Sequence, residues 1–585
     1  MMSNDQPARP AFDGNGAANP DASSAATPLP IVVCGASLGG VVAAWRLCES
    51  GHRVLLAAEH AWLGGQFTAQ AVPPDEHALI EHGGATASYR RFREALRDHY
   101  RADPDFLDRA QLTEGCNPGD GWVSRVCVEP RVAAALFEDW LAPHVQGARL
   151  RIARGVVPVR VLRDGRRLLS VTLRDAQERE ETVAADWFLD ATDTGELLGL
   201  AGLPYRLGKE AASSFGEPDA PLQADLLDQQ PLTWVMALRR LGTPGRPTAL
   251  DIGPKPPDYD FWRRRVVPHH RHAQFSLEMP GAAPGRSSAL PLFGSGATLD
   301  WWRYRRIVAS NQRRSPRDEV SLINWAQNDY ALQPLLDGPQ PEQAVAAAAR
   351  RLSLCLLHWL RTEAPRAGGG RGHPELVPAT DMLGTPDGLA QQVYVRESRR
   401  IVGLTTLTQR DIAAVDAAVD AAVDAEVDAA VGAANAADAP ASTSATLNRS
   451  DSVGVAWYPM DIHPTCVSGR GANARVRPFT LPLGSFIMAD CDNLLPACKN
   501  LSVTHLVSAC TRVHPVEWLA GEVAALLLHQ AKQRGLTPAL LHASATETRC
   551  LQAALLSAGV PIHWNEELTA RAGIAATAGA SHARL

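Results

Sequence analysis

Residues 29–59 constrain this chain more than any other stretch, because a strand, a glycine turn, a helix and a second strand follow one another without interruption. The apolar run 29–34 predicts a buried strand, and residues 53–58 predict another. The turn after the first strand contains three glycines: Gly35, Gly39 and Gly40. Strand, turn, alanine-rich helix and strand in this order indicate the first βαβ unit of a dinucleotide-binding sheet.

The residues of the turn suit contact with a diphosphate. Gly35 permits a tight strand-to-helix turn, Gly40 lets the helix pack closely on the sheet, and Ser37 replaces the usual middle glycine with little bulk. Free N–H groups and the positive end of the helix favour a diphosphate there. Glu59 lies 59 − 40 = 19 residues beyond the last glycine, where a carboxylate can accept hydrogen bonds from ribose hydroxyls. The alternative interpretation is an ordinary βαβ unit with a glycine-rich turn.

A second glycine pair directly after the acidic residue gives the sequence a family resemblance. Residues 62–68 read Trp-Leu-Gly-Gly-Gln-Phe-Thr, and residues 72–77 read Val-Pro-Pro-Asp-Glu-His. These motifs resemble a branch of the FAD-dependent oxidoreductases, which are glutathione-reductase-type flavoproteins distantly similar to the flavin subunit of heterodisulfide reductase. The resemblance extends over most of residues 29–535, and it implies FAD as a non-covalently bound cofactor.

The resemblance also implies which residues contact FAD. The strand near Val157 is expected beside the adenine, the Asp-Ala-Thr motif that ends at Thr192 approaches the cofactor, and Lys499 stands where relatives often carry arginine. The last helix, opened by Pro515, is expected to aim its positive end at the flavin and stabilise the anionic reduced ring. The predicted cofactor site is Gly35, Ser37, Gly39, Gly40, Glu59, Gly64, Gly65, Gln66, Val157, Ala191, Thr192, Lys499, Val516 and Glu517.

The predicted fold class is α/β, with a Rossmann-like FAD-binding domain, made of a parallel sheet plus a β-meander, and an inserted α+β substrate domain. Between residues 200 and 480 tryptophan and arginine become frequent, and the β/α alternation disappears. The predicted boundaries are a disordered arm at 1–28, the first part of the FAD-binding domain at 29–199, a substrate domain at 200–480 with a low-complexity insertion at 411–445, a closing FAD-binding segment at 481–535, and a helical appendix and tail at 536–585.

The predicted substrate domain has three informative features. It contains no second strand–glycine–helix unit, so a dedicated NAD(P)H domain is not expected. Residues 411–439 repeat Ala-Ala-Val-Asp, a four-residue period that drifts around a helix of 3.6 residues per turn. Residues 394–403 read Tyr-Val-Arg-Glu-Ser-Arg-Arg-Ile-Val-Gly and match a motif of the family. The three arginines of that motif either bind an anionic substrate or form an ion-pair network with Glu397.

Three residues are the candidates for catalysis. His463 and His505 could move a proton, because histidine titrates near neutral pH. Arg512 could pair with a carboxylate or a flavin oxygen. For each histidine a structural role is an equal alternative.

Composition excludes several classes of partner. The net charge of −6 argues against a nucleic-acid partner, because no basic surplus is present to meet phosphates. The ten cysteines include no C-x-x-C pair, so neither a zinc site nor an iron–sulfur cluster is predicted. No apolar run is long enough to cross a bilayer, and residues 1–28 lack the features of a secretory signal. A cytoplasmic protein with reduced thiols, no metal and a small-molecule substrate is expected; the oligomeric state stays open.

The favoured function is an FAD-dependent oxidoreductase that takes a hydride or an electron pair from a small organic substrate. One alternative is an electron-transfer flavin subunit similar to that of heterodisulfide reductase, although those relatives carry cysteine-rich motifs that this chain lacks. A second alternative is a flavin-bound scaffold without turnover. The sequence leaves the substrate and the final electron acceptor undetermined.

Overall fold

Five parallel strands form the predicted sheet, in the order β22-β7-β1-β2-β3. The computed structural model describes residues 30–106, 116–242, 252–268, 272–280, 287–294, 298–413, 449–565 and 567. The predicted arm at 1–28, the repeat from residue 414 onward and most of the tail lie outside these residues. The strands of the sheet are β1 (Ile31–Cys34), β2 (Val54–Ala58), β3 (Leu150–Arg154), β7 (Phe188–Asp190) and β22 (Leu494–Pro496).

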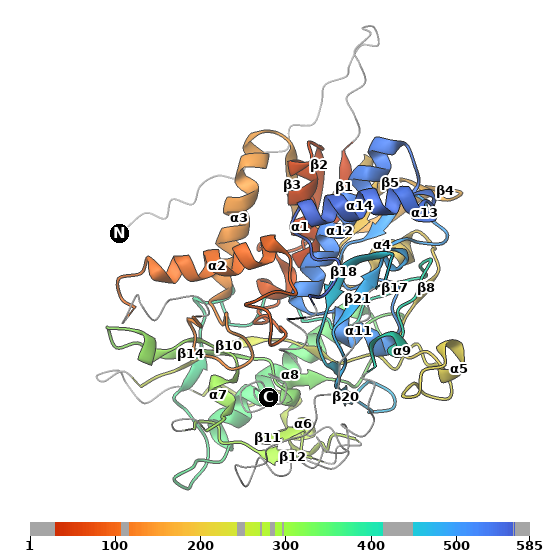
Figure 1. Ribbon diagram of the computed structural model, residues 1–585. Helices are drawn as coiled ribbons and strands as arrows, with labels where there is room; N and C mark the ends of the chain where they lie inside the picture. The colour runs from red at the N-terminus through yellow and green to blue at the C-terminus, as the bar shows by residue number, and fades with distance from the viewer. Residues whose placement is uncertain are drawn as a thin grey trace.

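The sheet joins the two ends of the described chain. Strand β22 comes from the C-terminal part of the chain and pairs in parallel with β7, so the closing segment returns to the sheet as predicted. Before β22 in the chain, β21 (Phe479–Pro482) pairs with β18 (Ser452–Ala456) in a separate antiparallel pair. Helix α1 near the N-terminus and the blue C-terminal helix α12 lie side by side in Figure 1.

Helices α1 (Leu38–Glu49) and α12 (His514–Arg534) pack against each other through glycines. A Cβ atom on Gly521 would lie 2.2 Å from the carbonyl oxygen of Gly39, and a Cβ on Gly39 would lie 1.9 Å from that of Ala497. Distances this short leave no room for any side chain. The two glycines therefore set how closely the C-terminal helix approaches the N-terminal glycine turn.

Two further helices cover this unit, α2 (Ala87–Arg101) and α3 (Pro130–Gln146). An aromatic cluster joins them to α12: the rings of Phe92 and Phe137 stack with centroids 4.4 Å apart, and Trp518 lies 5.2 Å from Phe92. The predicted β-meander consists of β4 (Val156–Asp164), β5 (Arg167–Asp175) and β6 (Glu180–Ala184), followed after β7 by α4 (Glu196–Leu200).

The region between residues 200 and 480 contains its own antiparallel sheet, in the order β13-β14-β10-β16. Its strands are β13 (Arg306–Val308), β14 (Glu319–Ile323), β10 (Met236–Arg240) and β16 (Leu376–Pro378). The long helix α8 (Glu342–Thr362) packs beside this sheet in the lower part of Figure 1. Most of the tryptophans that mark the region are buried in its core: Trp262, Trp301, Trp302, Trp325 and Trp359. A parallel sheet combined with separate antiparallel sheets confirms the predicted fold class.

Shorter elements connect these units. Those of the 200–480 region are β8 (Tyr205–Arg206), α5 (Ala212–Phe215), β9 (Leu232–Thr233), α6 (Tyr259–Arg264), β11 (Glu278–Pro280), β12 (Ser287–Ala289), α7 (Trp301–Tyr304), η2 (Ser310–Gln312), η3 (Ala326–Asn328), β15 (Asp329–Tyr330), β17 (Arg400–Ile401), α9 (Gln409–Ile412), β19 (Met460–Ile462) and β20 (Ala472–Ala474). Elsewhere they are η1 (Gly65–Phe67), η4 (Leu483–Phe486), α11 (His505–Thr511), α13 (Pro538–Ala543) and α14 (Ala545–Ser557), the last two forming the predicted helical appendix.

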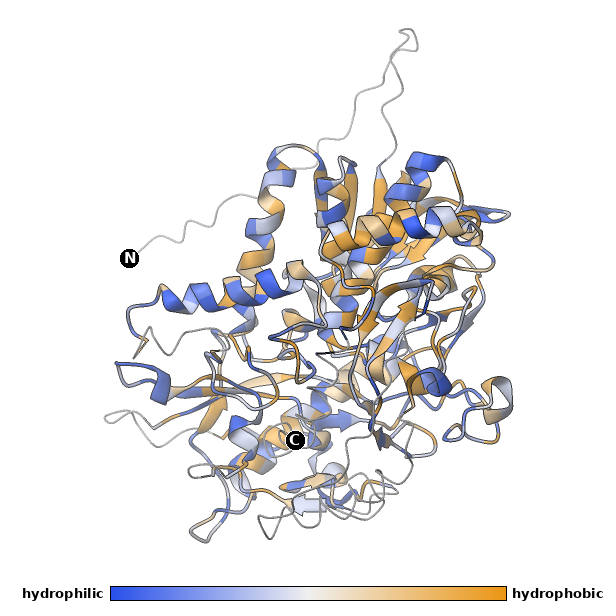
Figure 2. Cartoon of the chain, viewed as in Figure 1, coloured by the Kyte–Doolittle hydropathy of each residue, from blue (hydrophilic) through white to orange (hydrophobic). Residues whose placement is uncertain are grey.

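Hydropathy follows this architecture. Figure 2 shows apolar residues concentrated on the strands of the parallel sheet, whereas α2 alternates apolar and polar residues along its length. Among the described residues no helix is both long and apolar enough to span a membrane. The same residues contain no group of three or more histidine, cysteine and acidic side chains placed to hold a metal ion. All ten cysteines are free.

The chain segments on either side of the repeat are held together. Asp411 and Ile412, which the sequence assigns to the repeat, belong to α9, where Asp411 caps the helix and Ile412 is fully buried. Arg449 on the far side lies 3.5 Å from the Asp411 carboxylate, and the N–H of Arg477 donates to the carbonyl of Ile412. The gap between residues 413 and 449 can therefore be bridged by a short linker.

Replacing residues 414–448 with a four-residue glycine–serine linker is expected to leave the melting temperature unchanged or slightly higher. Closing a long loop costs only about 0.6 kcal/mol per doubling of its length, and shortening removes part of that cost. Extending the deletion to residue 411 removes the α9 cap and buried Ile412, and this control should melt at a lower temperature. Unfolding of the shorter deletion in differential scanning calorimetry would show that residues 414–448 contribute to the core.

Candidate functional site

A cleft opens at the carboxyl ends of β1, β2 and β7, where parallel α/β sheets bind their ligands. Residues of the predicted cofactor site line it: Gly35, Ser37, Glu59, Gly65, Val157, Ala191 and Thr192. The opposite wall comes from the 200–480 region and includes Leu335, Glu342, Val393 and Val395. A second hollow, of about 860 Å³, lies along β3 and contains none of the predicted site residues.

The glycine turn is held by very close backbone contacts. Gly35 has φ +98°, and a Cβ there would lie 2.2 Å from the carbonyl oxygen of Ala191. A Cβ on Gly40 would lie 2.1 Å from the carbonyl oxygen of Gly35. Ser37 is the N-cap of α1, and its Oγ accepts a hydrogen bond from the N–H of Gly40 at 3.2 Å. Ser37, at the middle position of the glycine turn, thus stabilises the start of α1 and also leaves space for a diphosphate.

Glu517 lies behind this turn and does not line the cleft. Its carboxylate accepts a hydrogen bond from the N–H of Gly39 at 3.3 Å and one from Nε2 of Gln66 at 2.5 Å. Gln66 also donates to the carbonyl of Arg512 at 3.1 Å. Burial is the largest cause that raises the pKa of Glu517. Glu517 and Gln66, both predicted to contact flavin, therefore connect α12 to the first glycine turn, and Val516 is likewise buried.

The end of the cleft near Glu59 contains carboxyl groups that sequence reasoning missed. The Glu59 side chain is 54% exposed, and Glu196 and Glu342 line the same cleft. Burial, together with the negative charges of Glu59 and Asp190, raises the pKa of Glu196 to about 8. Glu196 is therefore largely protonated at neutral pH and can donate a hydrogen bond. The sequence did contain a sign of this site. Glu196 directly follows Gly195, a glycine with φ +67° in the turn after β7.

Lys499 is buried, and its ammonium group pairs with Asp193. Burial alone would lower the pKa of Lys499, but Asp193 outweighs burial and the pKa is raised. Asp193 lines the cleft and also accepts a hydrogen bond from Nε2 of Gln392 at 3.2 Å. The lysine contacts the cleft only through this carboxylate.

Two of the three catalytic candidates lie together at Asp461. His463 places Nδ1 2.5 Å from Oδ2 of Asp329 and Nε2 3.4 Å from Oδ2 of Asp461. Arg512 donates from Nη2 to the Asp461 carbonyl at 3.0 Å and from Nη1 to the hydroxyl of Tyr394 at 2.7 Å. Asp329, Asp461 and Tyr394 were not predicted, because their roles depend on contacts between distant segments.

The pKa of His463 is raised above its ordinary value. Burial and Arg396 lower its pKa, but Asp329 and Asp461 together raise it further, so the net shift is upward. The pKa of Asp329 is lowered to about 2, since Arg396 and His463 outweigh the effect of burial. Both ring nitrogens face carboxylates, and an imidazolium in this position can donate a proton but cannot accept one.

His505 lies in a different network. Its Nδ1 is 3.0 Å from Oε2 of Glu210, which also pairs with Arg400 at 2.8 Å. Arg400 in turn contacts Glu397 at 2.7 Å, and all these side chains are buried. Arg400 therefore belongs to an ion-pair network with Glu397, which is one of the two alternatives predicted for the arginines of this motif. Arg396 of the same motif pairs instead with Asp329 at 3.0 Å.

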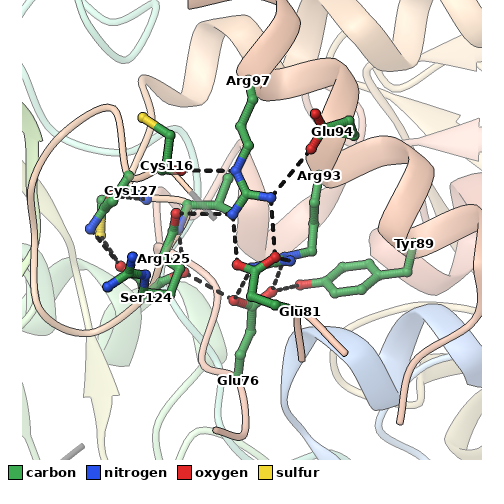
Figure 3. A network of polar contacts seen from close by, with 12 residues as sticks. Glu76, Glu81, Tyr89, Arg93, Glu94, Arg97, Cys116, Ser124, Arg125 and Cys127 are labelled. Carbon is green, nitrogen blue, oxygen red and sulfur yellow. Dashed lines mark hydrogen bonds and ion pairs between the residues drawn. The ribbon is translucent and has the colours of Figure 1, made fainter. Parts of the chain in front are cut away.

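A buried ion network fixes the loop that follows Gln66 (Figure 3). Glu76 accepts a hydrogen bond from the hydroxyl of Tyr89 at 2.6 Å and one from Nη2 of Arg93 at 3.2 Å. Glu81 accepts from Arg93 at 2.7 Å and from Arg97 at 2.6 Å. The loop is thus attached to helix α2. This attachment also fixes the neighbouring Asp75, which faces the site.

Replacing His463 with glutamine should lower the melting temperature more at about pH 6 than at about pH 9. The folded pKa of His463 is raised, so its ion pairs contribute fully below the unfolded value and are lost as the pH rises through the folded value. At the lower pH we expect a destabilisation of about 2 kcal/mol, discounted from fully buried pairs because the side chain is 24% exposed. Calorimetry of both proteins at the two pH values measures this, and a difference that grows with pH would contradict the charge assignment.

Comparison with known proteins assigns the family. The chain matches the FAD-dependent oxidoreductase family over residues 30–555. No curated protein sequence matches it.

Solved structures show likeness at low identity. The protein named AlpK is 11% identical, with a TM-score of 0.31, and the match covers 95% of this chain and 76% of AlpK. CabE, an aromatic hydroxylase from angucycline biosynthesis, is 13% identical with a TM-score of 0.27, and the match covers 65% of this chain and 54% of CabE. A flavoprotein/dehydrogenase from Cytophaga hutchinsonii is 16% identical with a TM-score of 0.22, and the match covers 38% of this chain and 48% of that protein.

The family match covers the glycine turn, the cleft and the returning helix α12, and the chain therefore belongs to the FAD-dependent oxidoreductases, with FAD as its cofactor.

Proposed function

We propose that this protein oxidises a small organic molecule by transferring a hydride or an electron pair to FAD held non-covalently in the cleft. One observation carries the proposal: the cleft at the glycine turn has one wall from the parallel sheet and the other from the 200–480 region. A cofactor bound in the cleft would face a region large enough to select a substrate. The fold supplies no second glycine-turn unit among the described residues for a nicotinamide nucleotide.

The residues at the turn fit the FAD diphosphate. Gly65 leaves space beside it, because a Cβ there would lie 2.8 Å from Cα of Ser37. The amino end of α1 provides a positive dipole, and Glu59 is placed to accept hydrogen bonds from a ribose. Bound FAD supplies the two-electron chemistry. In our proposal the protein binds FAD, excludes water from the cleft and holds the charged side chains around the substrate in place.

Residues around the start of α12 would position the substrate. Val513 is the N-cap of this helix, so Arg512 stands immediately before its positive end. Tyr394 and Asp461 hold the Arg512 guanidinium from the side of the 200–480 region. His463 would donate a proton at Nε2 or hold an anionic substrate group, because Asp329 and Asp461 raise its pKa and favour the protonated ring.

Replacing Gly40 with valine should abolish FAD binding. The valine side chain would collide with the carbonyl of Gly35 and the methyl group of Ala191, forcing α1 away from the sheet and disrupting the turn. Gly199→Ala is the matched control, because its added Cβ would lie 3.7 Å from the nearest atom. Flavin released on denaturation measures binding: the control should carry FAD at the wild-type ratio. A yellow Gly40→Val protein with full FAD content would disprove the placement of the diphosphate.

The proposed function can be tested by measuring which compounds reduce the bound flavin. We expect NADH and NADPH to reduce the bound flavin slowly or not at all, because the described chain offers one glycine-turn unit. Anaerobic stopped-flow mixing of the holoenzyme with each nucleotide, beside a panel of small organic acids, amines and alcohols, measures reduction directly. Rapid, saturable bleaching by NADPH would overturn the assignment and favour a hydroxylase. Bleaching by a member of the panel would support it.

A further inference from the structure

Two arginines and three tyrosines meet between the 200–480 region and the start of α12. We call this group the arginine–tyrosine recess, and its members are Arg305, Arg512, Tyr304, Tyr394 and Tyr458. Tyr304 and Tyr458 keep accessible surface, yet burial is the largest cause that raises the pKa of each. Tyr304 contacts the buried Arg305 on one side and keeps accessible surface on the other. Neither tyrosine belongs to the cleft at the glycine turn.

Arg305 is deeply buried without a full set of hydrogen-bond partners. Its side chain is 8% exposed, and its Nε and Nη1 atoms have no hydrogen-bond partner among the described residues. Nη2 lies 3.5 Å from Oδ1 of Asp75, and the guanidinium carbon lies 4.9 Å from the ring centre of Tyr304. Nε of Arg512 is also without a partner there. Leaving buried N–H groups unpaired is costly, so an acceptor from a ligand would be strongly favoured.

The carboxylates around the recess are Asp75, Asp329 and Asp461, and the arginines are Arg305, Arg396 and Arg512. His463 is a further cationic side chain when protonated, and Asp329 and Asp461 raise its pKa. Burial lowers the pKa of His514 to about 3. A monovalent anion would disturb this near balance of charge less than a dianionic phosphate would.

Resting on the proposed function, we propose that the recess binds a carboxylate group of the substrate, with Arg305 as the anchor. A planar guanidinium offers two parallel N–H donors that match the two oxygens of a carboxylate. The hydroxyls of Tyr304 and Tyr458 are available as further donors at its edge. Arg512, at one side of the recess, stands immediately before the positive end of α12, so a group attached to the carboxylate would extend toward the proposed flavin position.

The network of Figure 3 supports this geometry. Glu76 is fixed by Tyr89 and Arg93, which attaches the backbone next to Asp75 to helix α2. The N–H of Asp75 also donates to Nδ1 of His514 at 3.2 Å. At its distance of 3.5 Å, Asp75 pairs with Nη2 of Arg305 and leaves Nε and Nη1 without a hydrogen-bond partner among the described residues.

The test uses the holoenzyme and isothermal titration calorimetry with acetate, propionate, benzoate and phenylacetate, in parallel with difference spectra of the flavin. At least one carboxylate should bind and perturb the flavin band, and its uncharged amide should bind at least about tenfold more weakly. Arg305→Gln should weaken the carboxylate by at least about tenfold, and Arg305→Lys should recover part of the loss. Arg351→Gln removes an exposed arginine that pairs with Asp258, and this control should bind as the wild type does.

Three results would overturn the proposal: no carboxylate binds the wild type, Arg305→Gln binds as tightly as the wild type, or inorganic phosphate binds more tightly than every carboxylate. Melting temperatures show whether each variant is folded. If Arg305→Gln is not folded, Arg305→Lys decides by the same comparison. FAD content separates the two proposals: absence of FAD defeats the proposed function, whereas FAD without carboxylate binding defeats only the recess.

Discussion

The structure depends on the contact between helices α1 and α12. Neither Gly39 nor Gly521 could carry a Cβ atom, because each lies against a backbone carbonyl at about half the normal separation for such an atom. Only this approach allows the Glu517 carboxylate to reach the N–H of Gly39. It also places the start of α12, and with it Arg512, beside the turn formed near the N-terminus. The cleft and the recess are both positioned by this one helix pair.

The local elements of the nucleotide-binding unit could be predicted, since each depends on short-range patterns. The strand, turn and helix at residues 31–49 follow from apolar β-branched residues, glycines and alanines in order. Glu59, Gly65 and Val157 were placed at the cleft by the same motif logic. Glu517 and Gln66 were predicted at the same site, but they contact the turn and do not line the cleft. A motif cannot distinguish a residue that touches a ligand from one that supports the turn from behind.

The catalytic surroundings could not be predicted, for a different reason. Asp329, which lies 134 residues away in the sequence, raises the pKa of His463, and Arg512 donates a hydrogen bond to Tyr394 across 118 residues. The Arg305 environment depends on a loop held by an ion network on α2. Contacts of this kind have no local pattern. The sequence identified His463 and Arg512 as candidates, whereas their partners Asp329 and Tyr394 became apparent only in the folded structure.

The position of β22 in the sheet has a consequence for biosynthesis. Strand β7 pairs with β1 on one side and with β22 on the other. Because β22 lies near the C-terminal end of the described chain, it is translated after most of the other elements. Helix α1 likewise waits for α12 before its glycine face is covered. Contacts of such large sequence separation form late and slowly. During synthesis the nascent nucleotide-binding half has an unpaired strand edge and an uncovered apolar helix face, surfaces that favour aggregation until the C-terminal segment arrives.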